Sequence, residues 1–100
     1  MTALLYTDAA ERDLTRISLR IAADDPRAAR RFVERIRDHC AHLARFPDMG
    51  RARPDVHPGV RSLAHGSYVI YYQRHEDADE VHILRIWHGR RLTPAIADLL

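Results

Sequence analysis

Apolar residues recur at helical spacing in the first part of the chain. The positions that lie three or four residues apart are Ala10, Leu14, Ile17 and Ile21. This spacing predicts an amphipathic helix that ends at about Ala23. Asp8 stands three residues before Glu11, so we expect a capping box with Asp8 in the N-cap position. The short apolar segment Ala3–Tyr6 in front of it is expected to form an edge or terminal strand.

A second amphipathic pattern follows directly. Asp25 is the expected N-cap and Pro26 the first helical residue, because proline at this position loses no helical hydrogen bond. The apolar stripe of this helix consists of Ala29, Phe32, Val33, Ile36, Cys40 and Leu43. The segment Phe46–Gly50 ends the helix. Two such helices joined by a tight corner are expected to pack as an antiparallel hairpin.

The second half of the chain changes from helical to strand periodicity. The expected strands are Val60–His65, Tyr68–Tyr72 and Val81–His88. Gly66 and Ser67 form a hairpin turn, and the polar residues 74–80 form the next turn. Thr93 and Pro94 are expected to cap a short last helix. The sequence therefore predicts one α+β domain over residues 1–100. In it, an N-terminal strand and an antiparallel helical hairpin pack on an antiparallel β-meander, and a short C-terminal helix follows.

Composition narrows the class of protein. The chain has 100 residues, a formal charge of +2 and 16 basic residues, all of them arginine. Arginine suits carboxylate and phosphate partners, but so small a net charge does not by itself indicate nucleic-acid binding. Met1–Tyr6 lacks the pattern of a signal peptide, no apolar run is long enough to span a membrane, and a single cysteine excludes an internal disulfide. We therefore expect a cytoplasmic protein with no membrane partner.

The histidines and the cysteine do not form a convincing metal or nucleophile site. His39 and His42 lie three residues apart on the second helix, but no third ligand stands near them in the pattern. His82 and His88 share a face of the last strand by alternation, and by strand rise they are about 20 Å apart, too far for joint chelation. Cys40 belongs to the apolar stripe, as a buried side chain does. No glycine-rich phosphate loop is present either, so we expect no metal and no cofactor.

Five short motifs, in their order along the chain, resemble the RelE/ParE toxin superfamily. They are Tyr6–Leu14 (YTDAAERDL), Phe46–Arg51 (FPDMGR), Pro58–Ser62 (PGVRS), Gly66–Tyr72 (GSYVIYY) and Val81–Arg90 (VHILRIWHGR). The resemblance covers essentially the whole chain. It implies the toxin of a bacterial type II toxin–antitoxin pair, neutralised by a cognate antitoxin whose C-terminal part wraps the toxin. It also implies that DNA is contacted only indirectly, through the antitoxin complex.

The resemblance leaves two activities open. RelE-like members are similar to ribosome-dependent mRNA endonucleases, whereas ParE-like members are similar to inhibitors of DNA gyrase that block replication. For a ribonuclease, the candidate acid–base and phosphate-binding residues are His65, His88, Arg61 and Arg91. The RelE-like pattern expects a tyrosine or histidine in the final segment, but residues 92–100 contain neither. It also expects a strand arginine where Leu63–Ala64 stands. These departures favour ParE-like action, and a non-toxic antitoxin-binding co-repressor is a further alternative.

Two sets of residues follow as candidate interfaces. The expected gyrase-binding surface consists of Arg51, Arg53, Arg61, Trp87, Arg90 and Arg91, because arginine and tryptophan dominate interface hot spots. In the predicted fold these arginines are expected to converge along one side of the sheet. The expected antitoxin-binding residues are Leu14, Ile17, Ile21 and Phe32, on which an amphipathic segment packs. A ParE-like inhibitor needs no catalytic residue of its own.

Overall fold

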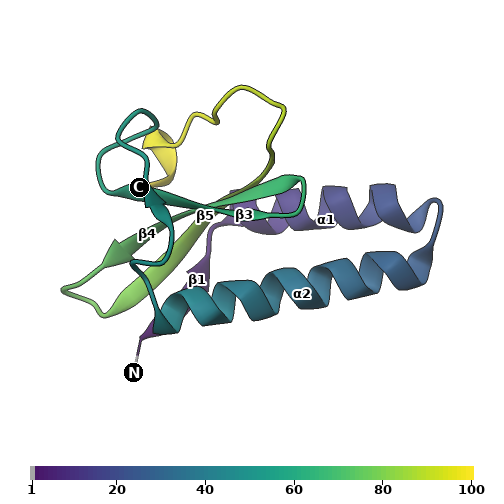
Figure 1. Cartoon of the computed structure of the whole chain (residues 1–100), viewed down its shortest axis with the longest axis horizontal. Coiled ribbons are helices and arrows are strands. Elements are labelled where there is room, and N and C mark those ends of the chain that lie inside the picture. The colour runs from purple at the N-terminus through teal and green to yellow at the C-terminus, as the bar shows by residue number, and fades with distance from the viewer. Residues whose placement is uncertain (1) are drawn as a thin grey trace.

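Two antiparallel helices lie against one face of a five-stranded mixed sheet in the computed structural model, which describes residues 2–100 (Figure 1). The elements are β1 (Ala3–Tyr6), α1 (Asp8–Ala22), α2 (Pro26–Arg45), β2 (Arg51–Ala52), β3 (Val60–His65), β4 (Tyr68–His75), β5 (Glu80–His88) and the short 3-10 helix η1 (Ala97–Leu99). The predicted α+β class, with its N-terminal strand, helical hairpin and β-meander, is confirmed. Over residues 2–100, no helix is long and apolar enough to cross a membrane.

The sheet has one strand more than the sequence predicts, because the short strand β2 joins the edge opposite the predicted strand β1. The strand order is β1-β5-β4-β3-β2, with β1 parallel to β5 and all other neighbours antiparallel. At the β2 edge, Arg51 pairs with Ser62 in a segment expected to be loop. The β4 strand also runs to His75, three residues further than predicted. Such pairing joins segments distant in the chain, and side-chain alternation within one segment does not report it.

Thr7, not Asp8, is the N-cap of α1. The Thr7 hydroxyl accepts a hydrogen bond from Ala10 N at 3.0 Å and donates one to Leu84 O at 2.8 Å. A carboxylate has no proton to donate, so an aspartate could not make both bonds. Asp8 instead lies in the first turn, where its charge complements the helix dipole. Asp25 caps α2 as predicted.

Apolar packing covers both faces of the sheet. The core under the helices includes Ile36, Leu43, Ile70, Tyr72 and Ile83, all fully buried. On the opposite face, Val60 and Tyr71 pack against Ile96 of the C-terminal segment. That segment was expected to form a short helix capped by Thr93, but only the 3-10 turn η1 forms and no side chain caps it. We attribute the missing helix to Ile96, whose side chain is buried against the sheet and keeps the segment in an irregular conformation.

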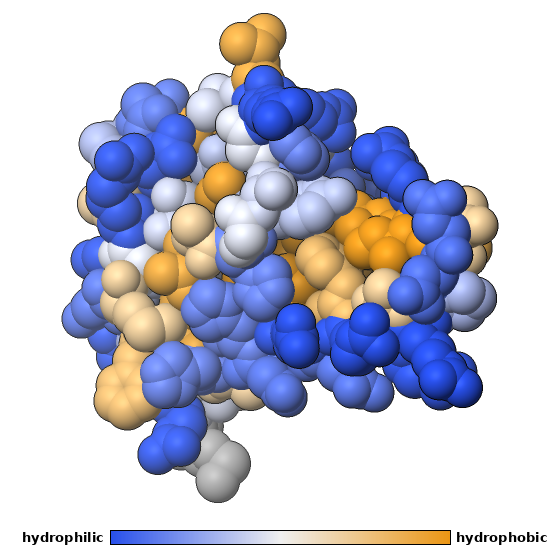
Figure 2. Space-filling model, turned by 45° about the vertical axis from the view of Figure 1, so that its right-hand side comes forward, coloured by the Kyte–Doolittle hydropathy of each residue, from blue (hydrophilic) through white to orange (hydrophobic). Residues whose placement is uncertain are grey.

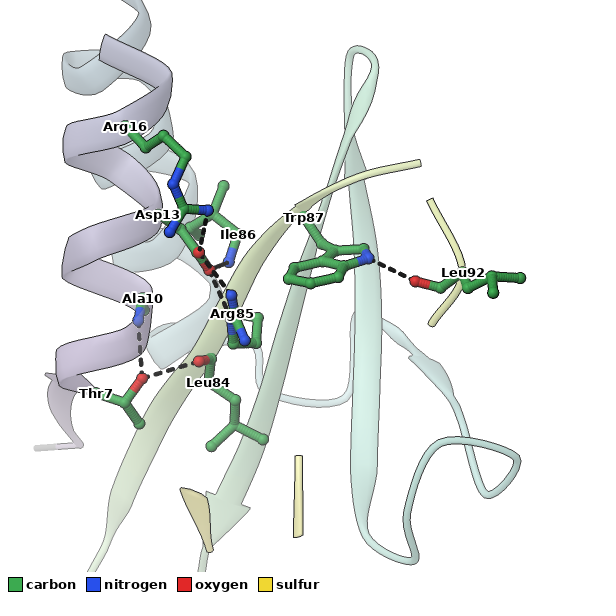
Figure 3. Close-up of polar contacts among 9 residues, drawn as sticks. All are labelled: Thr7, Ala10, Asp13, Arg16, Leu84, Arg85, Ile86, Trp87 and Leu92. Carbon is green, nitrogen blue, oxygen red and sulfur yellow. Dashed lines mark hydrogen bonds and ion pairs between the residues drawn. The ribbon is translucent and has the colours of Figure 1, made fainter. Parts of the chain in front are cut away.

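Polar side chains of α1 continue the edge of the sheet beyond the end of β1 (Figure 3). The β1 strand covers β5 only as far as Ile83. Beyond that point the Asp13 carboxylate, which is 2% exposed, accepts a hydrogen bond from Ile86 N at 3.0 Å and two from the Arg85 guanidinium at 2.8 Å. Arg16 adds an ion-pair contact of 3.7 Å. A buried carboxylate is tolerated only when its oxygens are bonded, so this arrangement fixes α1 against β5.

Asp13→Ala is expected to lower the free energy of unfolding by about 3–5 kcal/mol, because it leaves the partly buried Arg85 without its partner. Glu11→Ala is the matched control. Glu11 lies on the same helix and pairs with Arg37, but those side chains are 46% and 45% exposed. The expected loss for this exposed pair is about 0–1 kcal/mol. Urea unfolding measures both values, and equal losses would contradict a special role for the Asp13 pair.

Candidate functional site

The chain after β5 folds back over the ring of Trp87. The indole Nε1 donates a hydrogen bond to Leu92 O at 2.7 Å (Figure 3). The guanidinium carbons of Arg91 and Arg85 lie 3.7 Å and 4.4 Å from the ring centroid. Cation–π contact of this kind holds both guanidinium groups in fixed positions. We call Trp87 with Arg90, Arg91 and Leu92 the Trp87 arm; it ends in the Leu92 side chain, which is 91% exposed.

The structure separates the six predicted target-binding residues into two groups. Trp87 belongs to β5 and is followed by Arg90 and Arg91, whereas Arg51 lies on β2, three strands away across the sheet. Arg53 follows β2 and donates two hydrogen bonds to Asp55, at 3.0 Å and 2.9 Å. The arginines therefore do not converge on one patch.

Arg61 stabilises the loop that follows α2. Its guanidinium donates to Gly50 O at 2.7 Å. The buried Tyr72 hydroxyl accepts from Gly50 N and donates to Pro47 O, both at 2.8 Å. A Cβ atom on Gly50 would lie 2.5 Å from that hydroxyl oxygen, so glycine is required here by close approach. These contacts give the FPDMGR motif a structural role.

The two candidate acid–base histidines lie on opposite sides of Tyr68. His65, Tyr68 and His88 are in register across β3, β4 and β5. His65 Nδ1 lies 2.9 Å from His39 Nδ1 of α2. His88 packs edge-on against Tyr68, with ring centroids 5.2 Å apart, and its Nδ1 accepts a hydrogen bond from Arg90 N at 3.1 Å. His65 therefore joins α2 to the sheet, and His88 faces the segment that follows β5.

A groove of about 600 Å³ opens between the helical hairpin and the turn of the β3–β4 hairpin. Ile21, Phe32 and Tyr68 line it, with Arg31 and Arg35 among its polar residues. Figure 2 shows this side of the molecule, where an apolar hollow is bordered by polar side chains. We call it the hairpin groove. Of the predicted antitoxin-binding residues, Ile21 and Phe32 line this groove, whereas Leu14 and Ile17 are 3% and 7% exposed and belong to the core.

A second, smaller cleft of about 330 Å³ lies between α1 and the end of β5. Its polar lining residues are Asp13, Arg16, Arg20, Tyr68, His88 and Arg91. We call it the basic cleft. Sequence reasoning missed Arg16 and Arg20, which flank the core residue Ile17 on α1. Helical spacing places them beside the apolar stripe, but it does not say that this side of the helix faces the end of β5.

The remaining nucleophile and metal candidates are structural. Cys40 is fully buried, and burial raises the pKa of its thiol to about 11, which makes it a poor nucleophile. Among residues 2–100, no group of three or more histidine, cysteine, aspartate or glutamate side chains is placed to hold a metal ion. His82 and His88 face opposite sides of the sheet, contrary to the strand alternation, because a register shift between Tyr71 and Tyr72 interrupts the β4–β5 pairing.

Comparison with known proteins identifies the family. Residues 4–93 match the family model described as the ParE toxin of the type II toxin–antitoxin system, parDE. The chain belongs to the ParE toxin family. Toxin RelE1 of Caulobacter vibrioides is 32% identical to it over 90 residues, which cover 86% of this chain and 91% of that toxin. The resemblance to the RelE/ParE superfamily drawn from the five motifs is thereby confirmed.

Solved structures agree with this assignment. A chain of the chromosomal ParDE toxin–antitoxin system from P. aeruginosa matches this ParE-family toxin with a TM-score of 0.75 and 27% identity, over 88% of this chain and 96% of that one. A chain of the toxin–antitoxin complex RelBE2 from Mycobacterium tuberculosis matches with a TM-score of 0.63 and 26% identity, over 87% and 96%. The fold is thus shared by structures named for ParE and for RelE, so the fold alone does not choose between their activities.

The His39–His65 pair predicts a loss of stability in mild acid. Burial lowers the pKa of both rings from the ordinary 6.5, with added repulsion from His42 on His39 and from His39 and Arg35 on His65. As the pH falls, the unfolded chain therefore takes up protons before the folded protein does. The stabilisation is complete above about pH 6.5 and is lost as the pH falls through the folded-state pKa values.

His65→Gln is expected to reduce the difference in unfolding free energy between about pH 7.5 and about pH 5.5, because it removes one of the two titrating rings. His57→Gln, in the loop before β3, serves as the control and is expected to keep the wild-type difference. Urea unfolding at the two pH values measures the effect. An unchanged pH dependence in His65→Gln would contradict the assignment.

Proposed function

We propose that this ParE-family toxin acts on DNA gyrase in the cytoplasm. It blocks replication by binding to the enzyme, without cutting nucleic acid itself, and a cognate antitoxin holds it inactive. The observation that carries the proposal is the Trp87 arm, where the indole ring holds the Arg91 guanidinium and the chain continues to an exposed leucine. Such a surface suits binding to a protein, because tryptophan and arginine supply much of the energy of protein interfaces.

The geometry of the Trp87 arm favours tight binding. An arginine side chain that is free in solution loses rotamer entropy when an interface immobilises it. Arg91 has already lost much of that freedom, because its guanidinium rests on Trp87. Leu92 adds an apolar contact that is almost wholly exposed in the free toxin. The combination of one fixed cation, Arg91, and an exposed apolar side chain supports a docking role for Arg91 and Leu92, with the exposed Arg90 beside them.

The RelE-like alternative, a ribosome-dependent mRNA endonuclease, keeps one specific observation in its favour. His88 shares the basic cleft with Arg91, Arg16 and Arg20, so a proton-transfer group lies beside several cations. His65 lies on the other side of Tyr68 and contacts His39, which argues against joint action of the two histidines. The relative named Toxin RelE1 carries the RelE name, which agrees with this alternative. The growth experiment below therefore includes translation as a readout.

The antitoxin is proposed to bind in the hairpin groove. Ile21 and Phe32 offer an apolar floor, and Arg31 and Arg35 offer positive charge. An amphipathic segment with an apolar stripe and acidic flanks complements both features. In this arrangement the antitoxin binds the DNA operator, and the toxin is linked to the operator only through the antitoxin. The two solved structures named above come from toxin–antitoxin systems, which supports a partner of this kind.

Arg90→Ala combined with Arg91→Ala is expected to lower toxicity at least tenfold, because it removes both cations of the Trp87 arm. The matched control is Arg27→Ala with Arg30→Ala, two exposed arginines of α2. The toxin is induced without antitoxin while thymidine and methionine incorporation are followed together. In the wild type, thymidine incorporation is expected to stop well before methionine incorporation.

Each of the other outcomes supports a different function or overturns the proposed docking surface. Early collapse of methionine incorporation would support the ribonuclease alternative, and then His88 becomes the residue to replace. Normal growth of cells that express folded wild-type toxin would support the non-toxic co-repressor alternative. Full toxicity of the folded Arg90 and Arg91 double variant would overturn the docking role of the Trp87 arm.

Ile21→Ala is expected to weaken antitoxin binding by roughly tenfold, because it removes part of the apolar floor of the hairpin groove. Leu19→Ala is the control, since Leu19 lies two residues away on α1 and is 68% exposed, outside the groove lining. Titration of each variant with the cognate antitoxin gives the two dissociation constants. Equal affinities would place the antitoxin elsewhere, and thermal unfolding confirms that both variants are folded.

A further inference from the structure

The basic cleft unites cationic side chains from two elements that are distant in the chain. Arg16 and Arg20 stand one helical turn apart on α1, and Arg91 follows β5. The rings of His88 and Tyr68 also line the cleft, together with Asp13, Ile17 and Ile86. Arg16, Arg20 and Arg91 are exposed and take no part in the apolar core. Their convergence therefore calls for a ligand that is itself charged.

The charge of this cleft is positive after its internal pairing is taken into account. Three guanidinium groups line it, and Asp13 is the one carboxylate among its lining residues. That carboxylate is 2% exposed and already accepts two hydrogen bonds from Arg85, which is not part of the lining, and one from Ile86 N. Arg16 approaches it at 3.7 Å, as Figure 3 shows. Asp13 thus has little capacity left to neutralise Arg20 and Arg91.

Two of the donors are held in place by the chain itself. The Arg91 guanidinium lies 3.7 Å from the centroid of the Trp87 ring. His88 Nδ1 accepts a hydrogen bond from Arg90 N at 3.1 Å, which puts the proton of the neutral ring on Nε2 and makes that atom its donor. Donors positioned in advance lose less entropy when a ligand arrives.

The chemistry of these donors matches phosphate oxygens. A guanidinium group binds phosphate through paired N–H donors, and imidazole and phenol groups add single hydrogen bonds. The hairpin groove next to the cleft is the more apolar of the two and suits a peptide. We propose that the basic cleft binds the phosphodiester backbone of duplex DNA. The inference rests on the proposed function, because a gyrase-bound toxin works beside DNA. Phosphate contacts carry no sequence information, so operator recognition remains with the antitoxin.

The test measures binding of the free toxin to a fluorescent, mixed-sequence DNA duplex by anisotropy over a range of salt concentrations. Arg16→Gln with Arg20→Gln removes two cations from the cleft, and Arg27→Gln with Arg30→Gln removes two exposed cations from α2. The cleft variant is expected to bind at least tenfold more weakly than the control at low salt. Its slope of log K against log salt is expected to be smaller by roughly 2, since each phosphate contact contributes about 0.9.

The outcomes separate DNA from a protein ligand. Equal loss of DNA binding in the two double variants would overturn the proposal, because it would reflect net charge alone. Unchanged DNA binding with weakened antitoxin binding would also overturn it, and would make an acidic segment of the antitoxin the occupant. Arg20→Gln alone keeps the contact between Arg16 and Asp13. It is expected to change the salt slope by about half as much as the double variant does. The test therefore still holds if the double variant fails to fold.

A gyrase assay distinguishes failure of this proposal from failure of the proposed function. If wild-type toxin inhibits gyrase and the cleft variant inhibits it equally while binding DNA normally, the cleft has no role and the function stands. If wild-type toxin leaves gyrase unaffected but binds DNA through Arg16 and Arg20, the cleft is confirmed and the gyrase function is overturned.

Discussion

The arrangement of the remaining surfaces depends on the hydrogen bonds that the buried Asp13 carboxylate accepts from Arg85 and Ile86 N. Asp13 lies beside the part of β5 that extends past the end of β1. On that side the backbone groups of β5 have no neighbouring strand, so side chains of α1 take over their hydrogen bonds. Asp13 accepts hydrogen bonds from Ile86 N and Arg85, and Thr7, six residues earlier, donates one to Leu84 O. These contacts fix the rotation of α1 about its axis. The same rotation sets Arg16 and Arg20 in the basic cleft and directs Arg85 toward Trp87.

The other decisive feature is the extra residue in β5. Tyr72 pairs with Ile83 and Tyr71 with Arg85, so Leu84 is inserted and the alternation of side chains reverses beyond it. Ile86 consequently packs into the core under the helices, and Trp87 lies on the face covered by the C-terminal segment. With strict alternation these two residues would change faces. The bulge therefore allows the end of one strand to supply both the Trp87 arm and His88 of the basic cleft.

Tyr68 lies between the two candidate binding surfaces and lines both of them. On one side it contacts Phe32 in the hairpin groove, and on the other it contacts His88 in the basic cleft. A segment bound in the groove thus lies next to the cleft. The two surfaces differ in chemistry, since one is rich in apolar side chains and the other in guanidinium groups. The antitoxin segment and the DNA backbone that we propose for these two surfaces would thus bind side by side.

The sequence by itself determined the local elements and the family. Helical spacing located both helices, Asp25–Pro26 marked the start of α2, and Gly66, with a φ of +57°, marked the β3–β4 turn. Those features follow from nearest neighbours in the chain, which a pattern records. Only the tertiary structure decided the parallel pairing of β1, the choice of Thr7 over Asp8, the bulge at Leu84 and the meeting of Arg16 and Arg20 with Arg91. Each of these joins residues more than 70 positions apart or changes a strand's alternation, and spacing within one segment contains no information about such partners.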